Sequence, residues 1–317
     1  MLEEYSIERL SSDRFEVLFP LMKDCFGTDG NMDYFKWKFL ENPVGEFTAF
    51  VAVHNESKEV VSFYGIIPAL FNVKGKNKIL FQTVDGMTHS KHRRKGLFQM
   101  LGRHCYEYLK QQDNFFVFGF GGVQSTPTLC ELGWEKIFDM RYLFIPKIRC
   151  TSFSNLLIDT NFKEVNATQV FHLAQKKPQY AVNSVRTIEH FQWRLSNPLN
   201  PCKIIDYKGE GYVAFYTLGD KLFLFDYFFS SQTVSKKLIN YLKTVVKKNS
   251  LRGIITIAKD RSEGMKELNK LGFWMNPFSF GPLNVRIPFI YFTDKQTMKS
   301  LSDESIWNIS PYEHDAL

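Results

Sequence analysis

The chain has 317 residues, of which 44% are hydrophobic and 16% aromatic, and this apolar content excludes a chain that is disordered as a whole. The length is typical of two domains, and the apolar runs stay well short of the roughly 18 residues that a membrane helix needs. The start, Met1–Glu4, is acidic and has no apolar segment, so we expect no signal peptide and a cytoplasmic location.

The five cysteines are odd in number and contain no Cys-x-x-Cys spacing, so we expect reduced, mostly buried thiols. With the seven histidines they show no metal-ligand spacing, and we expect no metal site. The net charge of +7 usually accompanies nucleic acid, a membrane surface or a phosphorylated small molecule as partner. Two clusters carry much of this charge: Lys91–Lys95, and the group Lys236, Lys237, Lys243, Lys247, Lys248 and Arg252. The second follows a helical pattern and is interpreted as a solvated face.

The sequence repeats itself. Phe35–Pro43 and Phe191–Pro198 both read aromatic, any residue, tryptophan, basic residue, and then Asn-Pro. Further along, Leu80–Asp85 and Leu222–Asp226 are apolar runs typical of strands, and each ends on an aspartate. Several matches in the same order indicate a duplicated unit rather than chance.

After these strands each half continues with an amphipathic helix, an apolar strand and a short helix that ends in Leu-Gly-aromatic. The helices are expected around 97–108 and 238–246, the strands at 115–120 and 253–258, and the Leu-Gly-aromatic turns at Gly133 and Gly272. In the first copy, earlier strands are expected at 48–53, 60–66 and 69–73, and a final strand at 141–145. We therefore predict an α/β (α+β) protein of two tandem units, 1–148 and 149–317, each a mixed central sheet flanked by helices.

The segment Val84–Phe98 carries the clearest chemistry. A strand runs into a basic loop that contains Gly96, and the loop opens a helix. The first turn of a helix has unpaired N–H groups and the positive end of the helix dipole, which together favour a phosphate or pyrophosphate. A glycine lets the backbone approach such a ligand, and Arg93, Arg94 and Lys95 add charge. The alternative is a solvated basic turn.

Arg93–Phe98 resembles the acyl-CoA pyrophosphate loop of the GNAT N-acyltransferases, whose pattern is Arg/Gln-x-x-Gly-x-Gly/Ala. In that family the preceding strand splays from its neighbour and lines the acyl and pantetheine groups, and a later element leads to Leu-Gly-aromatic. The resemblance implies that acyl-CoA is bound by Met87, Thr88, His89, Arg93, Arg94, Lys95, Gly96, Leu97, Phe98, Gln124 and Ser125.

The chain departs from the GNAT pattern at two positions. Phe98 stands where glycine or alanine is usual, so its side chain must point away from the pyrophosphate. Leu129 stands where the family often has a tyrosine that protonates the departing thiolate. The adjacent Cys130 is interpreted as a buried packing thiol, so the proton is expected from water or from another group.

The duplicated Trp-basic and Asn-Pro signature resembles the tandem-GNAT acyltransferases of bacterial surface-polysaccharide pathways, including O-antigen and lipopolysaccharide biosynthesis. Among them are enzymes that N-acylate nucleotide-linked aminodideoxy sugars, such as the 3-hydroxybutanoyl transferases acting on dTDP-3-amino-3,6-dideoxygalactose. The resemblance implies 3-hydroxybutanoyl-CoA or acetyl-CoA as donor and a dTDP-sugar amine as acceptor. The second copy reads Gln232–Lys237 where the loop should be, without a glycine, and is interpreted as a degenerate unit that completes the acceptor cleft.

Direct transfer to an amine needs a base, donors to the oxyanion and a leaving thiolate. Asp85 is the first candidate for the base, although a structural carboxylate bonded to loop amides is an equal alternative, and His89 is the second. The expected bulge lies between Asp85 and His89, and the Thr88 N–H is the candidate oxyanion donor if the strand splays there. Asp226 is a candidate for holding the amine or sugar hydroxyls. Trp37 and Trp193 either stack on a sugar or base or anchor their own helices in the core.

Other functions remain open on the sequence alone. An acyltransferase acting on a protein or an aminoglycoside is one, although the basic charge disfavours cationic aminoglycosides. A tRNA-dependent peptidyl transferase would suit the charge but does not need the loop in its first copy. A non-catalytic nucleic-acid binder is disfavoured because the aromatic residues fall in apolar strand patterns. We expect no nucleic-acid partner and no membrane insertion, and a homodimer remains open.

Overall fold

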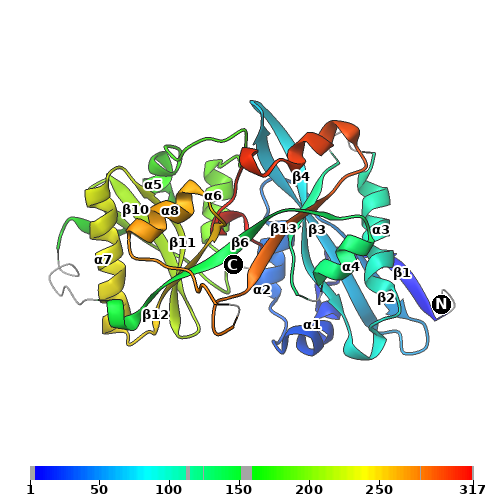
Figure 1. The fold of residues 1–317 in the computed structure, drawn as a ribbon. Helices are drawn as coiled ribbons and strands as arrows, with labels where there is room; N and C mark the ends of the chain where they lie inside the picture. The colour runs from blue at the N-terminus through cyan, green and yellow to red at the C-terminus, as the bar shows by residue number, and fades with distance from the viewer. Residues whose placement is uncertain (1–3, 112–114, 124, 151–158, 279, 316–317) are drawn as a thin grey trace. The chain divides into compact units, whose positions relative to one another are not determined.

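The computed structural model describes residues 4–111, 115–123, 125–150, 159–278 and 280–315. The chain forms two compact units that are both discontinuous in sequence (Figure 1). The N-unit comprises the residues up to Ile137 together with Pro288–Ile306, and the C-unit comprises Phe138–Ile287 together with Trp307–Asp315.

The N-unit is built on a mixed sheet with the strand order β1-β2-β3-β4-β5-β13. The strands are β1 (Tyr5–Arg9), β2 (Thr48–His54), β3 (Val60–Val73), β4 (Lys76–Thr88), β5 (Val117–Phe120) and β13 (Arg286–Phe292). The helices are α1 (Phe19–Phe26), α2 (Met32–Phe35), the π-helix η2 (Lys36–Leu40), α3 (Leu97–Leu109) and α4 (Ser125–Glu131). Short 3-10 turns are η1 (Phe15–Leu18), η3 (Ser90–His92), η6 (Gln296–Ser302) and η7 (Glu304–Ile306).

In the C-unit the strands follow the order β6-β12-β11-β10-β9-β7. The strands are β6 (Glu135–Pro146), β7 (Phe162–Val165), β9 (Lys203–Tyr207), β10 (Gly211–Leu218), β11 (Lys221–Phe229) and β12 (Gly253–Lys259), with the short β8 (Val182–Ser184) and β14 (Trp307–Asn308) paired to each other. The helices are α5 (Ala167–Ala174), α6 (Ile188–Leu195), α7 (Gln232–Lys248) and α8 (Glu263–Lys270), with the 3-10 turns η4 (Lys147–Arg149) and η8 (Pro311–Glu313). The predicted fold class, α/β units with mixed sheets flanked by helices, is confirmed.

The final strands of the two halves are exchanged. The strand expected at 141–145 exists as β6, but it pairs with β12 in the C-unit, where Leu143 lies opposite Thr256. In return, β13 pairs with β5 in the N-unit, where Ile290 lies opposite Gly119. The units therefore differ from the contiguous ranges 1–148 and 149–317, because an apolar pattern predicts a strand without specifying the strand that pairs with it.

The two strands expected at 60–66 and 69–73 are one strand, β3, which runs through Pro68. Pro68 lies opposite Phe81 in the antiparallel ladder to β4. A proline inside a paired strand is unusual because it has no N–H group to donate to the neighbouring strand. The turn after Val73 forms as expected, with Gly75 at φ 85°.

The predicted Leu-Gly-aromatic turns close α4 and α8 in the same way. Gly133 and Gly272 have φ of 89° and 95°, the left-handed region in which glycine is favoured. The amide of Trp134 donates to Leu129 O at 3.1 Å, and the amide of Phe273 donates to Leu268 O at 3.1 Å. Both aromatic side chains are buried, so each turn inserts its aromatic residue into the core of its unit.

Candidate active site

The loop before α3 leaves the start of that helix open. Gly96 is the N-cap residue, with φ 73° in the left-handed region, and no side chain caps the first turn. Arg94 also has a positive φ, 63°, so the chain turns sharply twice within three residues. Uncapped amides at the positive end of a 13-residue helix are a suitable site for an anion.

The three basic side chains of this loop have different surroundings. Lys95 Nζ donates to Glu4 Oε1 at 2.6 Å and to the Tyr5 hydroxyl at 2.8 Å, and the bond to Glu4 is the main cause that raises the pKa of Lys95. Arg93 Nε donates to the Thr88 carbonyl at 3.1 Å. Arg94 is exposed, and no salt bridge or hydrogen bond is recorded for its side chain within the described ranges. Arg94 is therefore the loop cation most available to a phosphate.

The Phe98 side chain leaves the helix start unobstructed. Its ring packs edge-on against Tyr64, with centroids 5.0 Å apart. It also covers Gly86 so closely that a Cβ there would lie 2.5 Å from Phe98 Cε2. Phe98 therefore contributes its backbone amide to the first turn, and Gly86 is needed so that the ring fits.

Strands β4 and β5 pair over a short stretch, at the middle of β4 and the start of β5. Their parallel ladder consists of Phe81 opposite Val117 and Gln82 opposite Phe118, whereas β4 continues to Thr88 and β5 to Phe120. The ladder ends at these residues, so in the part of the chain that the structure describes β4 continues toward Thr88 without pairing to β5. An open strand edge beside an uncapped helix start offers room for an extended chain that ends in a pyrophosphate.

A β-bulge places Asp85 beside this open edge. In the ladder between β3 and β4, Phe63 lies opposite Met87 but Gly65 lies opposite Val84, so two residues of β4 face one of β3. Asp85 is one of the two and has a left-handed φ of 49°, which aspartate tolerates better than most residues. The bulge consists of Asp85 and Gly86, so it includes Asp85 itself, whereas it was expected between Asp85 and His89.

Asp85 forms a buried ion pair that the sequence did not reveal. Lys38 Nζ lies 2.8 Å from Asp85 Oδ2, and the two side chains are 1% and 14% exposed. Lys38 also donates to the Tyr34 hydroxyl at 2.5 Å. Lys38 is the basic residue of the repeated Trp-basic motif, and this motif was the only feature of the sequence that drew attention to it. Nothing in the motif indicates that Lys38 contacts Asp85, which lies 47 residues away in the chain. The carboxylate reaches the surface, whereas the ammonium does not.

The other candidates on β4 and η3 are positioned mainly by backbone contacts. Thr88 Oγ1 lies 2.9 Å from Ser62 Oγ, and its carbonyl accepts the bond from Arg93. His89 caps η3 by accepting from the Lys91 amide at 3.2 Å, and its Nε2 lies 3.8 Å from Asp24 Oδ1. Met87 is buried. Thr88 and His89 thus lie next to the bulge.

The two tryptophan candidates are less exposed than a binding site requires. Trp37 and Trp193 are buried, which favours the alternative that they anchor their helices. Ser125 begins α4, where its hydroxyl accepts from the Gly122 amide at 3.1 Å, and Gln124 lies outside the described residues. The expectation for Cys130 was wrong: this cysteine is exposed, because Leu129 is the residue of α4 that turns into the core.

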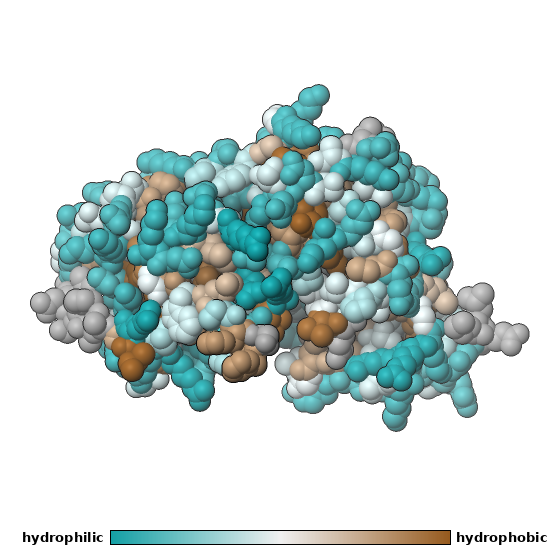
Figure 2. Space-filling view, viewed as in Figure 1, coloured by the Kyte–Doolittle hydropathy of each residue, from teal (hydrophilic) through white to brown (hydrophobic). Residues whose placement is uncertain are grey.

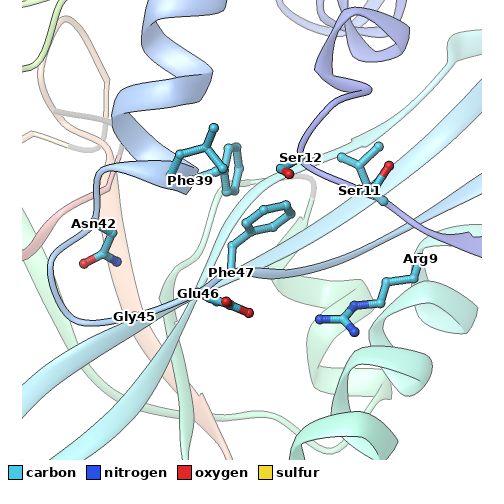
Figure 3. A pocket seen from close by; sticks show the side chains of 10 residues that line it. Arg9, Ser11, Ser12, Phe39, Asn42, Gly45, Glu46 and Phe47 are labelled. Atoms are coloured by element: carbon cyan, nitrogen blue, oxygen red, sulfur yellow. The ribbon is translucent and has the colours of Figure 1, made fainter.

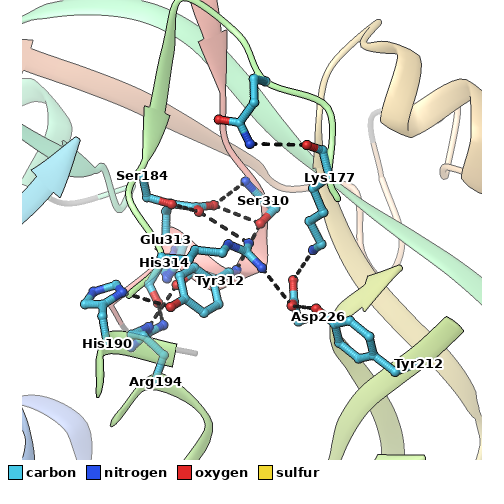
Figure 4. A network of polar contacts seen from close by, with 12 residues as sticks. Lys177, Ser184, His190, Arg194, Tyr212, Asp226, Ser310, Tyr312, Glu313 and His314 are labelled. Carbon is cyan, nitrogen blue, oxygen red and sulfur yellow. Dashed lines mark hydrogen bonds and ion pairs between the residues drawn. The ribbon is translucent and has the colours of Figure 1, made fainter. Parts of the chain in front are cut away.

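Asp226, the counterpart of Asp85, is enclosed in a polar network of the C-unit (Figure 4). It is 1% exposed and accepts bonds from Lys177, from Arg186 Nη1 at 2.8 Å and from the Tyr212 hydroxyl at 2.5 Å. Burial opposes its charge, but Arg186 and Lys177 outweigh burial and hold the pKa of Asp226 below its ordinary value. Its oxygens are thus already bound to three partners.

The C-unit also differs at the position of the loop. Helix α7 is capped by Ser231, whose hydroxyl accepts from the Val234 amide at 3.2 Å. The Thr256 hydroxyl of β12 donates to Leu224 O of β11 at 2.8 Å, just beyond the short parallel ladder of these strands. Because α7 is capped and the edge of β11 is hydrogen-bonded to β12, the C-unit has less room than the N-unit for a pyrophosphate and the extended group attached to it.

A separate hollow of about 670 Å³ lies in the N-unit between the end of β1 and the segment that leads into β2 (Figure 3). Phe39 and Phe47 line it, with Arg9 and Glu46 among its polar side chains. It contains none of the residues that the sequence assigned to catalysis or binding. In the described part of the chain, no three metal-ligating side chains come together, and no helix has the length and apolar character to cross a bilayer.

Comparison with known proteins agrees with this geometry. Residues 6–137 match the family model described as "Acetyltransferase (GNAT) domain". This segment is a GNAT acetyltransferase domain. The loop, the open strand edge and Asp85 all lie within it, and the chain is an acyl-CoA-dependent N-acyltransferase of the EC 2.3.1 type.

The fold of the whole chain is similar to several solved structures. A probable N-acyltransferase from Enterococcus faecalis V583 has a TM-score of 0.65 at 11% identity, covering 90% of this chain and 72% of that one. N-myristoyltransferase of Saccharomyces cerevisiae with bound myristoyl-CoA and inhibitors has a TM-score of 0.62 at 14% identity, covering 92% and 80%. A GCN5-related N-acetyltransferase from Kribbella flavida gives 0.61 at 11%, covering 92% and 72%. No curated protein matches the sequence significantly.

Proposed function

We propose that the enzyme transfers a 3-hydroxybutanoyl or acetyl group from CoA to the amine of a nucleotide-linked aminodideoxy sugar, such as a dTDP-sugar used for surface polysaccharides including O-antigen and lipopolysaccharide. The observation that carries the donor half is the uncapped start of α3 behind Gly96, beside the part of β4 that is not paired to β5. The acceptor half is supported by the duplicated Trp-basic and Asn-Pro signature and by the net charge of +7, which suits an anionic nucleotide.

In this proposal the donor lies along the open edge of β4. The amides of Leu97 and Phe98 and the side chains of Arg93 and Arg94 hold the pyrophosphate, because these groups surround the helix start. Lys95 acts indirectly, since its ammonium is bonded to Glu4 and shapes the loop. Met87, Thr88, His89 and Ser125 line the remainder of the donor site.

Asp85 takes the proton from the attacking amine, directly or through water. Its side chain is partly exposed at the bulge, and the Lys38 ammonium fixes its position. The Thr88 N–H stabilises the oxyanion, and His89 is the second candidate for the base. The proton for the departing thiolate comes from water, since Leu129 is buried and carries no acidic group.

The C-unit completes the acceptor cleft without binding a second donor. The cap on α7 and the Thr256 bridge support this division of labour. Asp226 is more suited to holding Lys177 and Arg186 in place than to binding a sugar hydroxyl itself, because its oxygens are occupied.

A mass-spectrometric screen tests the proposal. Acetyl-, 3-hydroxybutanoyl- and, because a similar fold binds it, myristoyl-CoA are offered with dTDP-aminosugars, a peptide amine and an aminoglycoside. The proposal predicts an amine-acylated dTDP-sugar and released CoA with one of the two short donors. Acylation of the peptide or the aminoglycoside alone would contradict the sugar acceptor but leave the acyltransferase activity intact.

A further inference from the structure

Helix α7 has a strongly basic outer side. Its seventeen residues include five lysines and no aspartate or glutamate. Leu238, Leu242 and Val246 turn into the core of the C-unit, so the lysines remain on the side that faces away from that core. Lys248, in the last turn, is exposed.

The turn η4 extends this basic side. The amide of Lys147 donates to Arg252 O at 2.8 Å, which joins η4 to the segment that follows α7. Helix α7 contacts η4, and Cys150 at the end of η4 lies in the same core cluster as Leu242 and Val246, so the second half of α7 lies close to the end of η4. We define the basic patch as Lys147, Arg149, Lys243, Lys247, Lys248 and Arg252.

Acidic side chains neutralise little of this patch. Arg252 pairs with Asp220 at 2.8 Å, and in the described ranges no salt bridge is recorded for the other five members. Asp220 also binds Lys221, so its charge is shared. The patch therefore keeps most of its positive charge, unlike the loop cation Lys95.

An aliphatic side chain protrudes from the patch. Ile148 lies between Lys147 and Arg149 and is 89% exposed, more than any other large hydrophobic side chain in the described residues. Arg149 also lies over the ring of Trp274, 5.9 Å from its centroid, and Trp274 is itself 36% exposed. Figure 2 shows hydrophobic side chains among hydrophilic ones along the lower edge of this unit. A single exposed isoleucine is common by itself, but here Lys147 and Arg149 flank it directly and the lysine-rich helix α7 contacts the same turn.

We propose that the basic patch binds an anionic phospholipid surface, with its cations at the head groups and Ile148 inserted below them. A lipid surface supplies both negative charge and an adjoining apolar layer, and this combination is what peripheral membrane sites use. A nucleic acid would use the cations but would leave the isoleucine in water. This inference goes beyond the proposed function, because the patch shares no residue with the loop or the Asp85 site.

Vesicle co-sedimentation with the full chain tests the proposal. The protein should sediment with vesicles that contain phosphatidylglycerol, remain in solution with phosphatidylcholine alone, and dissociate as salt rises. Arg149→Glu with Lys248→Glu should weaken binding by at least roughly twentyfold, at about fivefold for each charge removed. Ile148→Ser should weaken it by about tenfold without changing the charge.

The matched control is Lys76→Glu with Lys299→Glu, which makes the same change in net charge on exposed residues of the N-unit. This control should bind almost as well as the wild type, and all variants should keep the wild-type melting temperature and CoA affinity. Equal weakening by patch and control variants, no preference for phosphatidylglycerol, or binding to a DNA duplex in place of vesicles would overturn the proposal.

Discussion

The ammonium of Lys38 lies 2.8 Å from the carboxylate of Asp85, and this contact joins the Trp-basic motif to the bulge of β4. The lysine is the more deeply buried partner, at 1% exposure against 14%. Removing one member of a buried pair leaves the other charge uncompensated, whereas replacing both with neutral groups is often tolerated. The pair can therefore be used to separate a structural role of Asp85 from a catalytic one.

Asp85→Asn should lower the free energy of unfolding by about 3 kcal/mol, because Lys38 is left buried with a neutral partner. It should also lower kcat by roughly 100-fold, as expected when a general base is lost. The double variant Lys38→Met with Asp85→Asn should regain most of the stability but none of the activity. Denaturant unfolding and steady-state kinetics on both variants measure the two effects.

The loss of kcat should become smaller as pH rises, because more of the acceptor amine is then neutral before it reaches the enzyme. If the double variant regains activity together with stability, Asp85 has only a structural role, and His89 becomes the base to test.

Arg94→Gln should weaken CoA binding by about tenfold, since a charged hydrogen bond to a phosphate is worth roughly 1.5–3 kcal/mol. Lys95→Gln is the matched comparison and should have a smaller effect, because the Lys95 ammonium is bonded to Glu4 and Tyr5. Calorimetric titrations at two salt concentrations measure both affinities. A larger loss for Lys95→Gln would contradict the assignment of Arg94 as the phosphate ligand.

His190 should make the C-unit sensitive to acid. Burial, followed by the charges of Arg194 and Arg186, lowers the pKa of His190 from 6.5 to about 3. Between pH 6.5 and 3 the unfolded chain therefore binds a proton at His190 that the folded chain does not bind. The free energy of unfolding decreases as the pH falls through this window. Each pH unit in that window costs about 1.4 kcal/mol at most.

His190→Gln should flatten this part of the stability profile, and thermal unfolding across the pH range measures it. The exposed His172, replaced by glutamine in the same way, is the control and should keep the wild-type slope. Parallel profiles for His190→Gln and the wild type would show that the folded protein protonates His190 normally.

The sequence predicted most of what local patterns can encode. The glycine turn at Gly96 and the Leu-Gly-aromatic turns depend on neighbouring residues. The exchange of β6 and β13 could not be predicted, because an apolar run does not identify its partner strand. The Lys38–Asp85 pair depends on packing between distant segments, and the exposure of Cys130 depends on which side of a short helix contacts the sheet.

We expect one acyl-CoA to bind at the start of α3 and none to bind in the C-unit. Gly96→Asp places a carboxylate and a strained left-handed residue at that helix start. Gly27→Asp is the matched control, because Gly27 has nearly the same φ, 71°, at the exposed end of α1. Isothermal titration calorimetry should give one CoA per chain for the wild type and for Gly27→Asp, and no binding for a folded Gly96→Asp. Two CoA molecules per chain, or unchanged affinity in Gly96→Asp, would contradict the account.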